Sequence, residues 1–230
     1  NEITHGLLWP VGKVPAWESI SRLVSAGIRA VRDTFPEIPV MIHLDNGGNN
    51  ELYRNWFDRY LEHGGEEFEY IGLSYYPFWH GSLAALEANM RDLAGRYEKD
   101  IIVAEVSMGF TMEDYQKYEQ LGDEGRKGYA TKPELVQGLD YPMTKEGQAD
   151  FMQDFMTCIK DVPQGRGIGF FYWEPAWLPR HGSEWATKAA REYISEPGAG
   201  GNEWANQALF DYDGNALPAL TVIRDFSDTI

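Results

Sequence analysis

Two glutamates stand where carboxyl groups could do chemistry. Glu105 follows the apolar run Ile101 to Ala104, and a glutamate that ends a buried strand carries a desolvation cost that a function would have to justify. Glu2 stands at the start of the chain, where an acidic side chain is usually just solvated. Two carboxyl groups about 5 to 5.5 Å apart can act as acid/base and nucleophile on a glycosidic bond. For Glu105 the simpler alternative is an ion-paired residue at a strand end.

Four short apolar runs are typical of buried strands, and each leads into a loop with polar or aromatic residues. The runs are Val40 to Leu44, Tyr70 to Tyr76, Ile101 to Val106 and Gly167 to Trp173. The loop residues are Asp45 and Asn46, Tyr76 to His80, Glu105 to Ser107, and Trp173 to Trp177. A TIM (β/α)8 barrel gathers reactive residues at the carboxyl ends of its strands. The loops therefore favour this barrel over an open doubly wound sheet.

Amphipathic segments between the strands predict helices. Apolar faces run from Ile20 to Phe35, from Leu52 to Tyr60 and from Leu83 to Tyr97. Thr144 is expected to cap a fourth helix, with apolar positions from Phe151 to Ile159. Strand and helix thus alternate, which is typical of a parallel sheet covered by helices.

The chain, residues 1–230, is expected to be a single catalytic-domain segment that forms the C-terminal portion of a β/α barrel. Only Asn1 to Ile3 could be the tail of a strand before the first helix, so about five of eight strands, the fourth to the eighth, are expected here. The N-terminal strands would then be missing. We expect Glu2 to lie on a frayed terminus and the chain to self-associate through unpaired sheet edges.

Short motifs along the chain resemble, in order, those of the arabinogalactan endo-β-1,4-galactanase family of glycoside hydrolases. Asn1-Glu2-Ile3, followed by Gly6-Leu7-Leu8-Trp9-Pro10, looks like the family's acid/base segment at the end of the fourth barrel strand. The later matches are His43 to Gly47 (fifth strand), Ser74 to Gly81 (sixth), Val103 to Ser107 (nucleophile strand), Phe171 to Trp177 (eighth) and Asn206 to Asp211. Order, spacing and content agree over nearly the whole chain.

This resemblance implies an endo-acting, retaining enzyme that cleaves β-1,4-galactosidic bonds in galactan or type I arabinogalactan. Glu2 would be the general acid/base, and Glu105 would be the nucleophile that forms a galactosyl-enzyme intermediate. Glu2 must then hold a proton at the working pH, whereas Glu105 must be ionised and held by hydrogen-bond donors.

Further residues are expected to bind the substrate or to orient the carboxyl groups: Asn1, His43, Asp45 and Tyr76. Tyr76 is the candidate donor to Glu105, and its neighbour Tyr75, which points the other way on a strand, is the alternative. Asn1 would donate to the 2-hydroxyl group of the sugar. His43 either lies at the base of the same sugar site or is a core histidine whose hydrogen bonds are all made within the protein.

Tryptophans that follow strands are candidate platforms, because aromatic rings stack on the apolar C–H face of a sugar. The candidates are Trp9, Trp79, Trp173 and Trp177, with Trp173 closest to the cleaved residue, and core packing is the alternative for each. Trp17 and Trp56 fall on expected helices and are interpreted as core.

The composition favours a neutral ligand such as a sugar polymer. Lys and Arg number 20 against 36 Asp and Glu, and the net charge of -16 would repel nucleic acid and anionic lipid. The sequence has no apolar run of about eighteen residues, so no membrane insertion is expected. Cys158 is the only cysteine and is expected to be a buried, inert thiol.

Neither a metal nor another cofactor is expected. The five histidines are scattered, with no HxH or HExxH spacing. Asp211 to Asn215 begins like a calcium loop, but Val222 stands where the last ligand is needed, and a turn at Asp213-Gly214 is simpler. Some galactanases of this kind hold a structural calcium after the nucleophile strand, and Met108 to Asp140 lacks the aspartate-glycine cluster used there.

Two alternatives stay open. Another β-1,4-glycanase of the same barrel clan, acting on mannan, xylan or glucan, would share the two glutamates. An inactive carbohydrate-binding fragment would result if the absent strands were needed to complete the cleft. The resemblance further implies an extracellular or cell-surface protein that takes part in the degradation of pectic polysaccharide.

Overall fold

The computed structural model describes residues 1–113, 133–179, 187–195 and 204–227. Contacts within the chain divide it into two units, each of which is described by itself. Unit 1 comprises residues 1–106 and 158–171, and unit 2 comprises residues 107–157 and 172–230. The expectation of a single domain stays a prediction.

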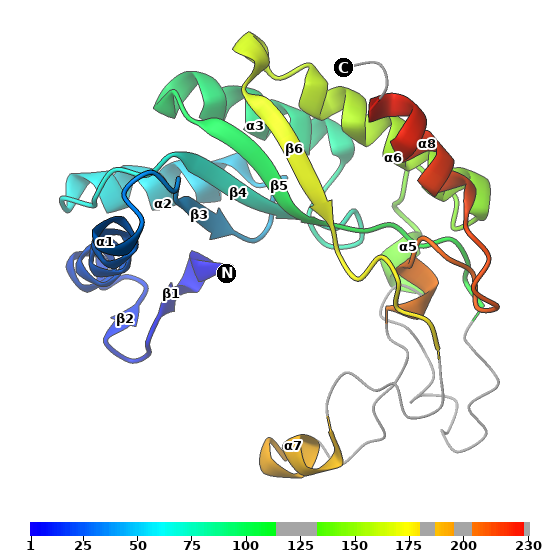
Figure 1. Cartoon of the computed structure of the whole chain (residues 1–230), viewed down its shortest axis with the longest axis horizontal. Coiled ribbons are helices and arrows are strands. Elements are labelled where there is room, and N and C mark those ends of the chain that lie inside the picture. The colour runs from blue at the N-terminus through cyan, green and yellow to red at the C-terminus, as the bar shows by residue number, and fades with distance from the viewer. Residues whose placement is uncertain (114–132, 180–186, 196–203, 228–230) are drawn as a thin grey trace. The chain divides into compact units, whose positions relative to one another are not determined.

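Unit 1 is built on a four-stranded sheet in the order β3-β4-β5-β6, in which β3, β4 and β5 pair in parallel (Figure 1). The strands are β3 (Met41–Leu44), β4 (Tyr70–Tyr75), β5 (Asp100–Val106) and β6 (Gly167–Tyr172). All four strands expected from the apolar runs are therefore present, and their bounds differ from the expected ones by no more than about one residue.

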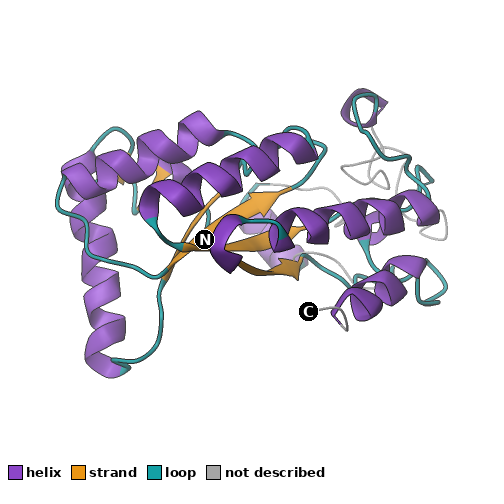
Figure 2. Cartoon of the chain, turned by 90° about the horizontal axis from the view of Figure 1, so that it is seen from above, coloured by secondary structure: helices purple, strands orange, loops and turns teal. Residues whose placement is uncertain are grey.

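The helices expected in unit 1 are also present. They are α1 (Trp17–Thr34), α2 (Asn50–Glu62) and α3 (Leu83–Tyr97). The side chain of Asn49 accepts a hydrogen bond from the backbone N–H of Leu52, and that of Ser82 accepts one from Ala85, so α2 and α3 begin at polar caps. The two helices contact each other, and the view of Figure 2 shows helices lying over the strands.

The helix that begins after Thr144 is α6 (Lys145–Lys160), which runs from unit 2 into unit 1. The hydroxyl group of Thr144 accepts a hydrogen bond of 3.0 Å from the N–H of Gly147, which confirms the expected cap. Cys158, near the end of α6, is half-buried rather than fully buried as expected, and its Sγ lies 4.0 Å from a carboxylate oxygen of Glu87.

Short elements that the apolar pattern did not indicate complete the described chain. They are β1 (Gly6–Leu7), β2 (Gly12–Lys13), α5 (Pro133–Val136), α7 (Lys188–Tyr193) and the 3-10 turns Ile3–His5, Pro163–Gly165 and Ala205–Gln207. The last described helix is α8 (Pro218–Ser227), in a stretch whose sequence is helix-like. None of the described helices is long and apolar enough to cross a membrane.

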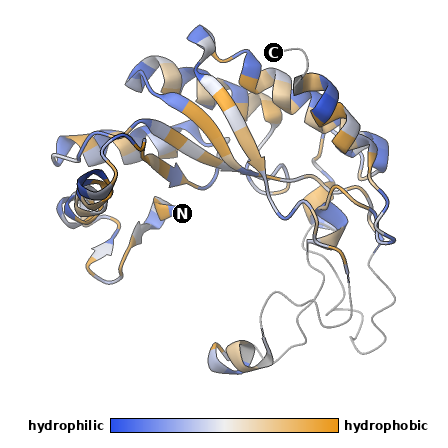
Figure 3. Cartoon of the chain, viewed as in Figure 1, coloured by the Kyte–Doolittle hydropathy of each residue, from blue (hydrophilic) through white to orange (hydrophobic). Residues whose placement is uncertain are grey.

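Aromatic side chains, several of them from α2, form much of the core of unit 1. Trp56 and Tyr60 stack with ring centroids 5.5 Å apart, and Phe57 stacks on Phe68 at 5.4 Å. Trp17 meets Trp56 edge-on at 6.0 Å. Trp56 is buried in the core, as expected, whereas Trp17 is only half-buried. Hydropathy mapped on the ribbon shows apolar residues along the strands that this core supports (Figure 3).

The two faces of the sheet differ because side chains alternate along each strand. One face carries apolar residues that are almost fully buried: Ile42, Leu44, Ile71, Leu73, Tyr75, Ile101 and Val103. The other face carries His43, Gly72 and Ser74, with His43 paired in register with Gly72. The buried polar side chains of His43 and Ser74 thus share one face of the sheet.

A register shift in β5 decides which face Glu105 occupies. Leu73 pairs with Val103, but the next residue of β4, Ser74, pairs with Glu105, so Ala104 is an extra residue in the strand. Without this shift, alternation from Ile101 and Val103 would place Glu105 on the apolar face. Bulges of this kind re-aim side chains next to functional sites. Here the shift puts Glu105 on the same face as Ser74.

The amino-terminal segment is not the tail of a strand, so the expectation for Asn1 to Ile3 was wrong. Glu2 has a left-handed backbone with φ 45°, which interrupts any extended run, and a 3-10 turn follows at Ile3–His5. Nor is the segment frayed. The N–H of Asp45 donates to the hydroxyl group of Thr4, and the indole N–H of Trp56 donates to the carbonyl oxygen of Ile3. These hydrogen bonds hold the segment against β3 and α2.

Unit 2 contains a buried polar network. The side-chain amide of Gln148 donates to the carbonyl oxygens of Met108 and Ala208, at 2.7 and 3.0 Å. The hydroxyl group of Tyr172 donates to the carbonyl oxygen of Gln207, and that of Ser107 donates to the Gln207 side chain. These bonds tie α6 to the segments that follow β5 and β6.

The chain from Asp211 to Asn215 forms a turn, as expected. A carboxylate oxygen of Asp211 accepts from the N–H groups of Asp213 and Asn215, and Gly214 has φ +87°. These bonds, with one from Lys145, lower the pKa of Asp211 to about 2. The expectation for calcium in Met108 to Asp140 falls partly on residues 114–132, which lie outside the described chain.

Candidate active site

Four side chains meet at the carboxyl ends of the parallel strands in unit 1. His43 comes from β3, Ser74 from β4, Glu105 from β5 and Glu2 from the anchored amino-terminal segment. One oxygen of each glutamate and one ring nitrogen of His43 all lie within 4.8 Å of one another. The structure therefore brings together the two carboxyl groups that the sequence suggested as a pair.

Glu2 is held by a hydroxyl group. Ser74 is fully buried, and its Oγ donates a 2.6 Å hydrogen bond to Oε1 of Glu2. On its other side, Oγ lies 2.8 Å from Nε2 of His43. Gly72 makes room for this arrangement, because a Cβ atom there would lie 2.8 Å from Sδ of Met41 and 3.1 Å from Cβ of His43.

Glu105 is held by a phenol. The hydroxyl group of Tyr76 donates a 2.7 Å hydrogen bond to Oε2 of Glu105, whereas that of Tyr75 donates to the carbonyl oxygen of Gly81. Burial raises the pKa of Glu105, the hydrogen bond from Tyr76 lowers it, and the charge of Glu2 raises it. The net shift is upward, so Tyr76 opposes the direction in which burial and Glu2 drive the carboxyl group.

The pKa values of two histidines near the pair lie below the usual range. Burial lowers the pKa of His43 to about 4, and burial also lowers the pKa of His80. Nδ1 of His80 lies 3.0 Å from the carbonyl oxygen of Ser74 and accepts from the N–H of Tyr76 at 3.2 Å. His80 therefore supports the loop that follows β4.

Among the expected polar binding residues, Asp45 has a buried carboxylate oxygen, Oδ1, that lacks a hydrogen-bond donor among the described residues. A buried carboxylate oxygen without a partner is costly, and a hydroxyl group that donated to it would remove that cost. Asn1 is exposed beside Glu2.

The four candidate tryptophans fall in different settings. Trp79 has 39% of its surface exposed and meets edge-on, at 5.8 Å, the ring of Tyr76, whose hydroxyl group bonds to Glu105. Trp9, 57% exposed, lies between β1 and β2, which pair as an antiparallel hairpin, and Nζ of Lys13 lies 4.2 Å from the centroid of its ring. Trp173 and Trp177 belong to unit 2, where Trp173 is exposed and the indole N–H of Trp177 is buried without a partner among the described residues.

Sequence reasoning missed Ser74 and Thr4, although both fall near motifs that it used. A serine at a strand end gives no chemical signal of its own, and its partner Glu2 lies 72 residues away in the sequence. The one available clue was position, because Ser74 begins the stretch Ser74 to Gly81 that resembles a barrel strand end.

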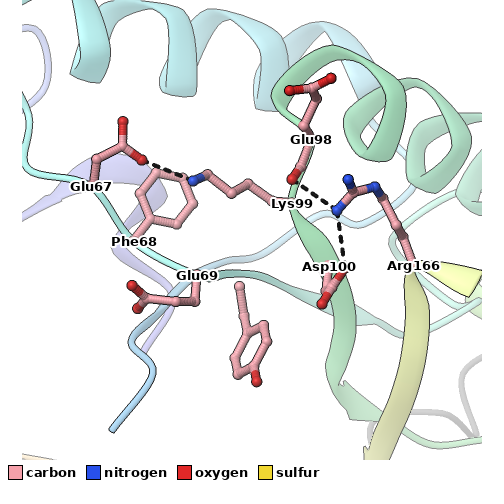
Figure 4. Close-up of a pocket in the computed structure, with 8 residues that line it drawn as sticks. Glu67, Phe68, Glu69, Glu98, Lys99, Asp100 and Arg166 are labelled. Carbon is pink, nitrogen blue, oxygen red and sulfur yellow. Dashed lines mark hydrogen bonds and ion pairs between the residues drawn. The ribbon is translucent and has the colours of Figure 1, made fainter. Parts of the chain in front are cut away.

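A pocket of about 360 Å³ lies at the opposite, amino-terminal ends of the strands (Figure 4). Lys99 pairs with Glu67 at 2.9 Å, and Arg166 pairs with Asp100 at 3.2 Å and donates to the carbonyl oxygen of Glu98. These groups satisfy one another across the starts of β4, β5 and β6. In barrels, features at this end contribute to stability rather than to chemistry.

Comparisons with known proteins identify the family of the chain. The model of glycosyl hydrolase family 53 matches residues 1–223. The chain is 35% identical to an endo-beta-1,4-galactanase of Bacillus subtilis and 30% identical to an arabinogalactan endo-beta-1,4-galactanase of Humicola insolens; each alignment covers 97% of the chain. It spans 53% and 59% of those two proteins.

Among solved structures, the catalytic domain from Ignisphaera aggregans described as GH53 superposes with a TM-score of 0.83 at 35% identity. That superposition covers 97% of this chain and 56% of the solved one. The parallel strands and their helices are accordingly part of an α/β barrel, as the loops after the strands indicated. On the extent of the family match, the chain belongs to glycosyl hydrolase family 53.

Proposed function

We propose that this chain carries the acid/base and the nucleophile of a retaining endo-β-1,4-galactanase that acts on galactan or type I arabinogalactan. The spacing of Glu2 and Glu105 carries the proposal. An oxygen of one lies within 4.8 Å of an oxygen of the other, a closeness that suits a retaining pair, whose carboxyl groups are about 5 to 5.5 Å apart.

Two relatives support the choice of polymer, because both are named as β-1,4-galactanases. The chain matches just more than half of the length of each relative, so we propose, by similarity, that it shares the activity of those whole proteins. Extracellular or cell-surface action on pectic galactan goes with it, since a polymeric substrate has to be met outside the cell.

The proposed reaction has two steps. In the first, Glu2 gives its proton to the glycosidic oxygen while Glu105 attacks the anomeric carbon, so that the bond to the leaving sugar breaks and a galactosyl ester forms. In the second, Glu2 takes a proton from water, which attacks the same carbon and releases Glu105. The residues present perform both steps, and the expectation that no metal or cofactor takes part stays a prediction.

Substrate contacts follow from exposure and from unmet hydrogen bonds. Trp79 presents an exposed ring beside Tyr76, and Asp45 offers a carboxylate oxygen that lacks a partner among the described residues. Asn1 would donate to the sugar 2-hydroxyl group. Trp9, Trp173 and Trp177 are further candidate platforms along the polymer.

The nucleophile assignment is tested by Glu105→Ala. This variant should lose nearly all galactan cleavage, and added azide should restore turnover with an inverted product, because azide attacks from the side that the carboxylate left open. The matched control is Glu98→Ala, at the other end of the strands, which should cleave at about the original rate. Unchanged turnover in Glu105→Ala would refute the role.

Competing substrates are separated by comparing galactan with mannan, xylan and glucan under the same conditions. If reducing ends were released faster from one of the other polymers, that polymer and not galactan would be the substrate. Binding of galactan without any cleavage by the unaltered chain would identify a carbohydrate-binding protein instead.

We also infer that the chain self-associates through the edges of its sheet.

A further inference from the structure

The buried hydroxyl group of Ser74 connects His43 to Glu2. Oγ of Ser74 lies 2.8 Å from Nε2 of His43 and 2.6 Å from Oε1 of Glu2, and Ser74 is fully buried. A serine hydroxyl group has one proton to donate, so it can donate to only one of these two partners. The direction of donation fixes where the protons of both neighbours lie.

When Glu2 is ionised its carboxylate can only accept, so donation from Ser74 goes to Glu2. Nε2 of His43 must then be the donor in the other hydrogen bond, because Oγ of Ser74 has no second proton and the two atoms are 2.8 Å apart. His43 is neutral and carries a single ring proton, which this arrangement places on Nε2. The chain of donation therefore runs from His43 through Ser74 to Oε1 of Glu2.

We propose that Ser74, held by His43, is a positioning residue that keeps the catalytic proton of Glu2 on Oε2. With Oε1 accepting from Ser74, a proton on Glu2 is favoured on the other oxygen, because a protonated Oε1 would be a weaker acceptor for Ser74. The opposite direction of donation would put that proton on Oε1, aimed at Ser74 and away from a substrate. The inference rests on the proposed role of Glu2 as acid/base.

The arrangement serves both steps of the proposed reaction. Before the first step, Oε2 carries the proton that passes to the glycosidic oxygen. After it, the carboxylate keeps the hydrogen bond from Ser74, and Oε2 takes the proton of the attacking water. Neither step requires Ser74 or His43 to change its own protonation. The other titratable groups around these residues are Asp45, Tyr53, Tyr76, His80 and Glu105.

A substrate that needs no acid separates this role from a structural one. Cleavage of a dinitrophenyl β-galactobioside needs little help from a proton donor, and azide attacks the ester without a base. Ser74→Ala should therefore lose about 10- to 100-fold on galactan, the value of a hydrogen bond to a charged group, yet stay within about threefold of the original chain on the activated substrate with azide. Ser74→Thr, which keeps the hydroxyl group, should recover most of the galactan activity.

Controls identify which claim fails. Glu2→Ala should show the same contrast more strongly, with a loss of about 10²- to 10⁴-fold on galactan and rescue by azide; if it does not, the proposed function is wrong. Ser21→Ala removes another buried hydroxyl group of unit 1, one bonded to the carbonyl oxygen of Tyr60, and should change neither rate selectively. If Glu2→Ala behaves as expected but Ser74→Ala loses both activities equally, or neither, the positioning role alone is overturned.

The tautomer of His43 gives a readout that needs no folded Ser74 variant. Nitrogen NMR of the unaltered chain labelled at its histidines, assigned with His43→Gln, should show the proton of His43 on Nε2. A proton on Nδ1 with a bare Nε2 would mean that Ser74 donates to His43, which would overturn the proposal.

Discussion

Glu105 is subject to opposing influences that act on a single carboxyl group. Burial and the charge of Glu2 raise its pKa, and the hydrogen bond from Tyr76 lowers it. A nucleophile attacks in its ionised form, which is populated only above its pKa. Activity should therefore be lost as the pH falls through the pKa of Glu105, and Tyr76 sets how far down the pH scale the site can work.

Replacing Tyr76 with Phe tests this balance. Without the hydroxyl group, the pKa of Glu105 rises further, so the acid limb of the plot of kcat/KM against pH should move to higher pH. On that limb the loss should reach about 10- to 100-fold, and it should shrink as the pH rises. Tyr97→Phe, which removes a hydroxyl group bonded to Asp58 instead, is the control and should leave the limb in place. A uniform loss at every pH would show that Tyr76 acts in some other way.

Single residues were predictable where their chemistry is visible in the sequence. Glu105 ends an apolar run, and Tyr76 follows a strand, so both could be named in advance. Ser74 could not, because a serine becomes informative only when its partners are known, and Glu2 and His43 reach it from distant segments. The upward shift in the pKa of Glu105 was likewise unexpected, since it depends first on how deeply the folded chain buries the carboxyl group and then on the charge of Glu2.

The amino-terminal segment is positioned by elements that lie far from it in the sequence. Thr4 accepts from the N–H of Asp45 after β3, and Ile3 accepts from Trp56 on α2. Both bonds are made within two residues of Glu2, which therefore derives its place from β3 and α2 rather than from a strand of its own. Trp56 packs in the core, as expected, but its indole N–H also fixes the position of this segment.

Thr4→Val should show how much Glu2 depends on this anchoring. Valine has nearly the same shape but no hydroxyl group, so the N–H of Asp45 loses its acceptor, at a cost of about 1 to 3 kcal/mol in the free energy of unfolding. Galactan cleavage should fall by more than the loss of folded protein explains, because Glu2 moves with Thr4. Thr4→Ser, which keeps the hydroxyl group, is the control. Full activity in Thr4→Val, with only the melting temperature lowered, would contradict the anchoring role.

Elements were predictable where a local pattern defines them. Apolar runs gave the four strands, and polar caps such as Thr144 gave helix starts, because both are properties of neighbouring residues. The register shift at Ala104 could not be read from β5 alone, since it is defined by pairing with β4. The same limit explains the error at Asn1 to Ile3, where tertiary hydrogen bonds and a left-handed Glu2 replace an extended strand.

At the scale of the molecule, the sheet of unit 1 ends in strands with unequal protection. The 3-10 turn Ile3–His5 contacts β3. In the part of the chain that the structure describes, β6 pairs only with β5, and two of its apolar side chains are open to solvent: Ile168 is 47% exposed and Phe171 is 63% exposed. A strand with one unpaired edge and exposed apolar side chains is a template for another chain.

The chain should therefore self-associate through β6. Light scattering during size-exclusion chromatography should give a mass at least about twice that of one chain, and the mass should fall on dilution, since association through one edge depends on concentration. Replacing Ile168 and Phe171 with Lys puts charge on the edge and should return the chain to a monomer, because charged edge strands resist pairing. Leu61→Lys, at a 40% exposed apolar position on α2, is the matched control and should leave the mass unchanged. A monomer at every concentration would show that the edge is protected, and an equal effect of Leu61→Lys would assign the association to charge in general rather than to β6.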